Sequence, residues 1–279
     1  MIQIKNRVLE RTNNRPIVLD AFYAEEKLKQ PIVILCHGYK GFKDWGAWNI
    51  MSKLLANEGI CLIKFNFSHN GGTVENPIDF PDLEAFGQNN YSKELNDLSD
   101  VIGWTQHHFN NNPYVDINNI ILIGHSRGGG IVLLKAKEDD RVKKVVTLAG
   151  VSDFESRFGS PKDIELWRER GVKYVINGRT KQKMPHYYQF YEDFLAYRNQ
   201  LNIRGAAEHI KIPHLIIHGD KDTSVNVEEA LNLHKWNPKS QLEIIPNADH
   251  VFNTKHPWDK NELSDELKLV TKKILEFIT

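Results

Sequence analysis

The sequence predicts an α/β protein in which a mostly parallel sheet of eight strands is covered by helices on both faces. Short unbroken apolar runs recur along the chain, and this is the pattern of parallel strands that are buried on both faces. Segments with helical periodicity separate most of these runs. The length of 279 residues, with 41% hydrophobic and 26% charged residues, suits one globular α/β domain. We therefore expect residues 1–279 to form a single domain.

The chain begins with a predicted β-hairpin. Apolar and polar residues alternate over residues 2–9, TNNR (12–15) has the composition of a turn, and residues 16–24 form the second strand. The buried apolar runs then predict six further strands, at residues 32–36, 60–65, 120–124, 142–150, 214–219 and 242–246.

Helices are predicted between and after these strands. The segment 48–59 has helical periodicity and ends at Gly59, which is a stop signal. The segment 91–109 places its apolar residues on one stripe. Three more helices are expected, one that follows residue 124 and runs through Lys137, one at residues 226–236 and one at residues 262–278.

One long insertion interrupts this alternation. Residues 154–209 separate two consecutive strands and are far longer than a typical connection. Within them, residues 172–184 suggest a small hairpin with Asn177-Gly178 at a type I′ turn, and residues 187–198 suggest a helix. We interpret the insertion as a cap over the sheet edge, in which most aromatic residues form the cap's own small core and some line an acyl pocket.

Composition excludes several classes of function. Lys+Arg and Asp+Glu are equal at 36 each, which argues against a basic surface for nucleic acid. The N-terminal stretch has no long apolar core, so we expect no signal peptide and no membrane anchor, and a cytoplasmic protein is the default. Cys36 and Cys61 lie in apolar runs and are expected to be core residues. No cluster has metal-ligand spacing, and we predict neither a metal nor a cofactor. The sequence leaves homodimer formation open.

A serine between glycines marks the expected site. Gly124-His125-Ser126-Arg127-Gly128 follows a predicted strand and begins a predicted helix, which is the context of a nucleophile elbow. Such a turn is so tight that Gly124 and Gly128 must lack side chains, and the Ser126 hydroxyl projects above the strand ends. Neither a dinucleotide fingerprint nor a Walker A lysine is present.

A serine at its ordinary pKa needs a nearby base, and that base needs an acid to orient it. His250 lies in the polar loop after the last predicted strand, where the base is expected. Asp222 lies in the loop after the preceding strand and is our choice for the acid. Asp220 is the second choice, and Asp153, which follows an earlier strand, is the third.

Two backbone N–H groups are expected to bind the oxyanion of the reacting carbonyl. The Arg127 N–H lies at the start of the predicted helix and points toward a bound carbonyl oxygen. The second donor is expected in the loop after the 32–36 strand, where Gly38 permits an unusual turn and the Tyr39 N–H is the candidate. The Arg127 side chain is expected to point away from the site and to pair structurally.

These segments together resemble the α/β-hydrolase superfamily. HGY (37–39), GHSRG (124–128), HGDKD (218–222) and DHVF (249–252) occur in the order of that family and span nearly the whole chain. More narrowly, the chain is similar to the cinnamoyl/feruloyl esterase and acylaminoacyl-peptidase-like group. The resemblance implies a sheet that begins with an antiparallel hairpin, an insertion that helps form the substrate pocket, and a preference for aromatic-acid esters.

The expected activity is hydrolysis of a small-molecule carboxylic ester through an acyl-enzyme, with Ser126, His250 and Asp222 as the catalytic residues. Three alternatives remain open. They are a serine peptidase or acylaminoacyl hydrolase with the same triad, an acyltransferase in which an alcohol replaces water, and a binding module without catalytic activity. We expect neither nucleic acid nor a membrane as a partner.

Overall fold

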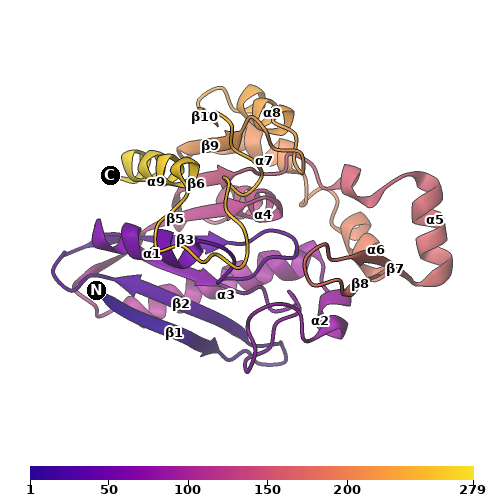
Figure 1. Ribbon diagram of the computed structural model, residues 1–279, viewed down its shortest axis with the longest axis horizontal. Helices are drawn as coiled ribbons and strands as arrows, with labels where there is room; N and C mark the ends of the chain where they lie inside the picture. The colour runs from indigo at the N-terminus through magenta and orange to yellow at the C-terminus, as the bar shows by residue number, and fades with distance from the viewer.

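An eight-stranded sheet lies at the centre of the computed structural model, which describes residues 1–279 (Figure 1). The strands follow the order β1-β2-β4-β3-β5-β6-β9-β10 across the sheet. The first hairpin pairs antiparallel, β2 pairs antiparallel with β4, and every other pairing is parallel. This confirms the predicted mostly parallel sheet. The strands are β1 (Ile2–Leu9), β2 (Ile17–Tyr23), β3 (Gln30–Cys36), β4 (Cys61–Phe65), β5 (Val115–His125), β6 (Val142–Leu148), β9 (His214–Gly219) and β10 (Gln241–Ile245).

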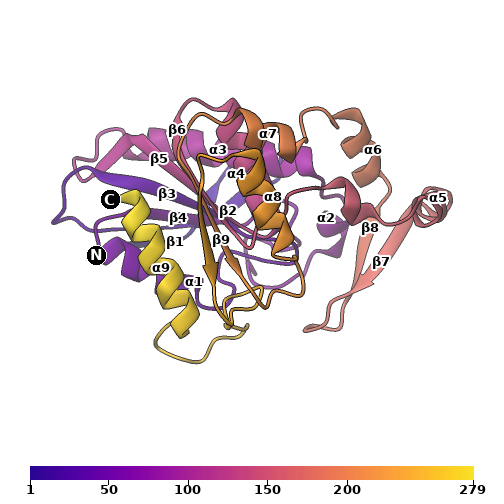
Figure 2. The same ribbon diagram turned by 90° about the horizontal axis from the view of Figure 1, so that it is seen from above.

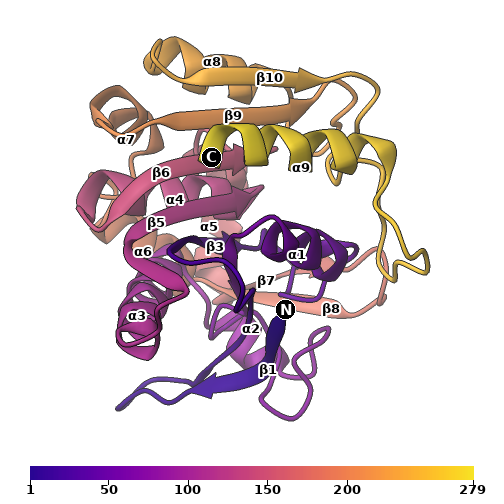
Figure 3. The same ribbon diagram turned by 90° about the vertical axis from the view of Figure 1, so that its left-hand side faces the viewer.

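Helices cover both faces of the sheet, as predicted. Figure 3 shows α1 (Trp48–Asn57) and α9 (Asp265–Ile278) on the near face. On the opposite face lie α3 (Tyr91–Phe109), α4 (Arg127–Glu138) and α8 (Glu228–Trp236). No helix of the chain combines the length with the apolar character needed to cross a bilayer.

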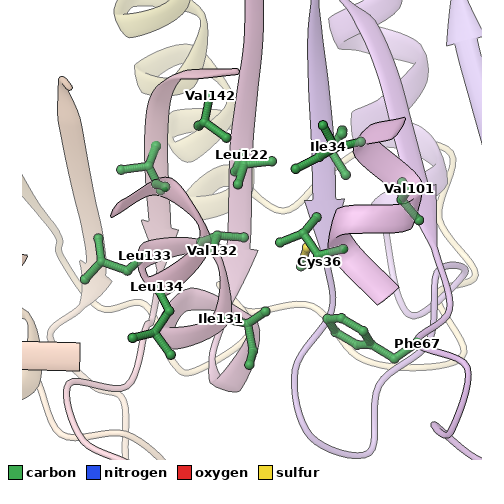
Figure 4. Close-up of a cluster of buried hydrophobic side chains, with 14 of the residues drawn as sticks. Ile34, Cys36, Phe67, Val101, Leu122, Ile131, Val132, Leu133, Leu134 and Val142 are labelled. Atoms are coloured by element: carbon green, nitrogen blue, oxygen red, sulfur yellow. The ribbon is translucent and has the colours of Figure 1, made fainter. Parts of the chain in front are cut away.

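The continuous apolar runs are explained by two separate cores. In β3, Ile34 and Cys36 belong to the core beneath α3 and α4, whereas Val33 and Leu35 belong to the core beneath α1 and α9. Figure 4 shows Ile34, Cys36 and Leu122 among side chains of α3 and α4. Successive strand residues point to opposite faces, so both must be apolar when helices cover both faces.

Helix starts depend on side-chain caps that periodicity does not report. The Ser264 Oγ accepts a hydrogen bond from the Leu267 N–H at 3.2 Å, and α9 begins at Asp265 rather than at the expected residue 262. The short helix α2 (Leu83–Gly87) was not predicted. Its start is fixed by Asp82, whose carboxylate accepts from the Ala85 N–H at 2.8 Å.

The segment from residue 154 to residue 209 contains more structure than the sequence indicated. Figures 1 and 2 show α5, β7 and β8 beyond the edge of the main sheet. The helix α5 was missed although its signals are present: Ser160 and Asp163 form a capping box around Pro161, and Gly171 ends the helix in a left-handed conformation. The elements are η1 (Glu155–Phe158), α5 (Pro161–Arg170), β7 (Val172–Ile176), β8 (Lys183–Tyr187), α6 (Gln189–Ala196) and α7 (Ile203–His209).

The predicted hairpin of β7 and β8 is present, but the predicted type I′ turn is wrong. A six-residue connection, 177–182, joins the strands, and the positive φ lies at Lys181 rather than at Gly178. The Asn177 side chain accepts hydrogen bonds from the Arg179 and Thr180 N–H groups. This side-chain turn replaces the expected backbone turn.

The aromatic residues of this segment do not form a separate core, contrary to our expectation. Phe158, Trp167 and Phe190 belong to the same cluster as the side chains beneath α3 and α4. The connection runs through Phe154, whose ring stacks on Tyr91 of α3 with 3.8 Å between centroids and 9° between planes. The segment is therefore packed onto the body of the protein by its aromatic side chains.

Candidate active site

Ser126 occupies the tight turn between β5 and α4, in the strained conformation that the glycine pattern predicts. Its φ of 56° and ψ of −121° are unusual for a residue with a side chain. A Cβ on Gly124 would lie 2.1 Å from the Gly128 carbonyl oxygen, and one on Gly128 would lie 2.6 Å from the Cys36 carbonyl oxygen. Both positions therefore exclude any larger residue.

The predicted acid and base are in contact. The His250 Nδ1 and the Asp222 Oδ2 lie 2.7 Å apart. The Asp222 carboxylate also accepts hydrogen bonds from the Ser224 and Val225 N–H groups at 2.8 and 2.9 Å. Burial raises the pKa of Asp222, but hydrogen bonds from His218, His250 and Val225 outweigh it and hold the pKa well below its usual value. Asp222 is therefore ionised at neutral pH and keeps the proton of His250 on Nδ1.

Two further histidines support this pair, and sequence reasoning assigned neither of them that part. The His218 Nε2 lies 3.2 Å from the Asp222 Oδ2 and donates to the Val225 carbonyl oxygen at 2.9 Å. The His125 Nε2 donates to the backbone carbonyl of His250 at 2.8 Å. Burial lowers the pKa of His125 to about 3, so this histidine stays neutral. HGDKD and GHSRG contain both residues, but the motifs do not reveal where the side chains point.

The alternative carboxylates have other partners. Asp220 accepts a hydrogen bond from the Asn247 N–H at 2.7 Å. Asp153 accepts from the N–H groups of the residues that begin η1. Of the three carboxylates that the sequence suggested, only Asp222 reaches His250.

The loop after β3 lies directly against Ser126. A Cβ on Gly38 would be 2.8 Å from the Ser126 Cβ and 3.0 Å from the His125 carbonyl oxygen. His37 fixes this loop, because its Nε2 accepts from the Phe67 N–H at 3.2 Å and its Nδ1 donates to the Gly38 carbonyl at 2.9 Å. The Tyr39 N–H donates to no acceptor of the chain and is free to bind a ligand.

The second predicted donor begins a helix. Arg127 is the first residue of α4. The first N–H groups of a helix have no intrahelical partner and carry the positive end of the helix dipole. The Arg127 N–H, which directly follows Ser126 in the chain, and the Tyr39 N–H therefore stay the two candidates for binding an oxyanion.

An ion cluster anchors the same loop to the sheet. The Lys43 Nζ lies 2.9 Å from the Asp20 Oδ1, and the Lys64 Nζ lies 2.7 Å from the Asp20 Oδ2. Asp44 pairs with both lysines. Burial raises the pKa of Asp20, but Lys64 and Lys43 outweigh it and hold the pKa below its usual value. We call Lys5, Asp20, Lys43, Asp44 and Lys64 the ion cluster.

Ser126 and His250 both line two cavities. The larger cavity has a volume of about 450 Å³ and extends beneath the segment 154–209. Aromatic side chains, among them Tyr91, Phe154 and Trp167, form part of its walls. The smaller cavity has a volume of about 230 Å³ and is lined in part by Trp45, Trp48 and Arg179. A molecule bound at Ser126 can therefore extend in two directions.

The Arg127 side chain does not point away from the site, and that expectation is wrong. It pairs with Glu94 at 3.2 Å, as a structural arginine would, but it also lines the larger cavity. Its guanidinium lies 4.5 Å from the centroid of the Tyr39 ring and 5.4 Å from that of Tyr91. The aromatic walls hold the arginine in the cavity through cation–π contacts.

No group of three or more His, Cys, Asp or Glu side chains is arranged to hold a metal ion.

Comparisons with known proteins agree with this architecture. Residues 84–275 match the sequence model of the prolyl oligopeptidase family, Peptidase_S9. A relative from Synechocystis sp., named "Putative non-heme chloroperoxidase", is 25% identical over 279 residues, with 88% of this chain and 93% of the relative covered. The structure of Est1E from Butyrivibrio proteoclasticus has a TM-score of 0.68 at 17% identity, with 98% of this chain and 96% of Est1E covered. A structure of Est1E with ferulic acid bound has a TM-score of 0.65 at 20% identity, with 94% of each chain covered. The α/β hydrolase GrgF from Penicillium sp. sh18 has a TM-score of 0.71 at 16% identity, with 100% of this chain and 98% of GrgF covered.

Proposed function

The chain belongs to the prolyl oligopeptidase family of α/β hydrolases, and from this premise we propose that it is a serine hydrolase of carboxylic esters. The observation that carries the proposal is the strained turn at Ser126, which opens onto the same cavity as His250, itself bonded to Asp222 at 2.7 Å. The family is one of hydrolases, and the choice of ester as substrate is our inference.

The geometry supports a two-step acyl transfer. The Ser126 Oγ attacks the ester carbonyl while the His250 Nε2 takes its proton, because Asp222 holds the other ring proton on Nδ1. The Tyr39 and Arg127 N–H groups bind the oxyanion of the tetrahedral intermediate. His250 then protonates the leaving alcohol, and an acyl-Ser126 ester remains. Water attacks this ester with His250 again as the base, and the free acid leaves.

The larger cavity favours an acid with an aromatic ring. Its walls contain Tyr91, Phe154, Phe158, Trp167 and Phe190, and its volume of about 450 Å³ is in the range of small-molecule sites. Est1E, which shares the fold, binds ferulic acid. We therefore propose esters of aromatic, cinnamoyl-type acids as the substrate class, with the acid in the larger cavity and the alcohol in the smaller one.

A peptidase is the second candidate, because the family model that matches the chain is one of peptidases. The same Ser126 and His250 would then cleave an amide. Parallel assays with an aryl ester and with an N-acyl-peptide anilide distinguish the two. We expect turnover of the ester at a kcat/KM at least about ten times that for the anilide. The reverse order would favour the peptidase.

The proposed nucleophile is tested by covalent labelling. We expect a fluorophosphonate to modify the wild-type chain at Ser126, as located by mass spectrometry, and to leave Ser126→Ala unlabelled. The same variant should lose at least about 1000-fold in hydrolysis of 4-nitrophenyl acetate, since an alanine cannot form the acyl-enzyme. Its thermal unfolding should resemble that of the wild type. Wild-type activity in Ser126→Ala, or a label on another residue, would overturn the proposal.

A further inference from the structure

The charged side chains that line the larger cavity all have the same sign. Lys40, Arg127, Arg157 and Lys173 contribute to its wall, whereas no aspartate or glutamate does. The chain as a whole is balanced, with 36 basic and 36 acidic residues, so this local excess is not a consequence of composition. The excess lies at the place where the acid part of the ester is proposed to bind.

The two arginines are compensated by carboxylates that lie outside the wall. Arg127 pairs with Glu94, with 3.2 Å between the Nη1 and Oε1 atoms. Arg157 pairs with Glu229, which also accepts a hydrogen bond from the Ser152 N–H. These pairs reduce the positive charge that the arginines present to the cavity.

The two lysines form no ion pair with a carboxylate. The Lys173 Nζ lies 3.7 Å from the centroid of the Trp167 ring and donates to the Phe158 carbonyl at 3.3 Å. The Lys40 Nζ lies 4.9 Å from the centroid of the Tyr39 ring. Ring faces and a carbonyl dipole orient an ammonium group, but they do not cancel its charge.

The pKa values of both lysines are lowered. Burial lowers the pKa of Lys173, although Asp163 raises it in part. Burial also lowers the pKa of Lys40, and Arg127 lowers it further. An anion bound between these side chains would have the opposite effect, because a nearby negative charge favours the protonated ammonium.

The backbone at Lys40 gives an independent reason to examine this side chain. Lys40 has a φ of 55°, which is a left-handed conformation that glycine adopts without strain. It directly follows Tyr39, the proposed oxyanion donor, and it lines both cavities. The backbone that carries this long basic side chain therefore lies next to the proposed oxyanion donor, in a conformation that favours glycine.

This inference rests on the proposed ester hydrolysis. We propose that the aromatic acid part of the substrate, which enters the larger cavity, carries a carboxylate. Lys40 and Lys173 supply the counter-charges for that carboxylate, while Tyr91, Phe154 and Phe190 pack against the ring. The two lysines belong to segments far apart in the sequence, the loop after β3 and the strand β7 of the insertion. In this arrangement the insertion determines which acids are accepted.

A matched pair of esters tests the inference. The 4-nitrophenyl ester of 3-(4-carboxyphenyl)propanoic acid carries the anion, and its 4-carboxamide analogue has nearly the same shape without the charge. After correction for their rates of alkaline hydrolysis, we expect the wild type to prefer the anionic ester at least about ten-fold in kcat/KM, the range expected for a charge-assisted contact. The preference should shrink as the ionic strength rises.

Variants of the lysines show whether these side chains create the preference. Lys173→Met and Lys40→Met should each reduce the ratio of kcat/KM for the anionic ester to kcat/KM for the carboxamide about ten-fold. Lys173→Arg should restore most of the loss, because it restores the charge. Lys162→Met is the matched control, since Lys162 is an exposed lysine of α5 outside the cavity, and it should have no effect.

The outcomes separate this inference from the proposed function. Equal turnover of both esters by the wild type would overturn the inference alone, and so would an equal loss for both esters in the methionine variants. If the wild type hydrolyses neither these esters nor 4-nitrophenyl acetate, the proposed function fails and the inference fails with it.

Discussion

Replacement of Gly38 by alanine tests the assignment of the oxyanion loop. The new Cβ would lie 2.8 Å from the Ser126 Cβ and 3.0 Å from the His125 carbonyl oxygen. Two carbon atoms in contact prefer about 3.5–4.0 Å, so the loop must retreat from Ser126 by about 0.7–1.2 Å. The φ of Gly38 is not positive, so a loss of activity in the variant would come from this contact and not from backbone strain at residue 38.

The retreat should remove one oxyanion donor. A good N–H···O hydrogen bond spans about 2.9 Å, and a shift of this size would lengthen it beyond hydrogen-bonding distance. Loss of one such donor costs about 100- to 1000-fold in kcat, or about 3–4 kcal/mol of barrier height. We expect Gly38→Ala to lower kcat for 4-nitrophenyl acetate by this factor. The thermal unfolding of the variant is measured in parallel.

The control is Gly178→Ala. No atom lies within 4 Å of a Cβ at Gly178, and its φ is not positive. This variant should retain full activity and gain up to about 1 kcal/mol of stability, because alanine restricts the unfolded chain. If Gly38→Ala retained more than a third of the wild-type kcat, the proposed position of the Tyr39 donor would be refuted.

Three further predictions concern the acid, the pH dependence and the ion cluster. Asp222→Asn should lower kcat about 10⁴-fold at nearly unchanged KM, because it removes the group that orients the base; a loss below ten-fold would exclude that role. Burial lowers the pKa of His214 to about 3. The unfolded chain binds this proton near pH 6.5, whereas the folded chain binds it only near pH 3. The contribution of His214 to the free energy of unfolding is therefore fully present above pH 6.5 and falls by up to about 1.4 kcal/mol per pH unit between pH 6.5 and pH 3. His214→Phe should flatten this slope in urea titrations at pH 7.5 and 5.5, and an unchanged slope would contradict the assignment. Asp20→Ala should lower the free energy of unfolding by about 3–5 kcal/mol, since it leaves Lys43 and Lys64 buried with less counter-charge; a change below 1 kcal/mol in urea unfolding would show that Asp44 compensates alone.

The elements that the sequence predicted well are those specified by local pattern. An apolar run bounded by polar residues identifies a strand that is buried on both faces, and all eight strands of the sheet lie where such patterns or the hairpin signals placed them. The turn at Ser126 was predictable because a turn of this kind leaves no room for a side chain at Gly124 or Gly128, where a Cβ would meet the Gly128 carbonyl oxygen and the Cys36 carbonyl oxygen, respectively. The contact between Asp222 and His250 was predictable because both residues follow strands that are neighbours in the sheet.

Side-chain directions could not be predicted in the same way. His125 and His218 lie within the predicted motifs, but their hydrogen bonds depend on how three loops meet at one edge of the sheet. The position of Arg127 in the cavity depends on Tyr39 and Tyr91, which lie in distant segments. The missed helix α5 is a different case, since its capping box is visible in the sequence and periodicity alone was too weak to reveal it.

The ion cluster ties the loop beside Ser126 to the first twenty residues of the chain. The Lys5 Nζ on β1 lies 2.7 Å from the Asp20 Oδ2, and Asp20 in turn holds Lys43 in the loop that contains Tyr39. A shortened chain that begins after β1 would keep Ser126, His250 and Asp222, the proposed catalytic residues, yet it would lose one of the ion pairs that hold the loop containing Tyr39. Such a protein could be well expressed and folded and still turn over slowly, so truncations and N-terminal fusions of this enzyme should be assessed by turnover rather than by yield.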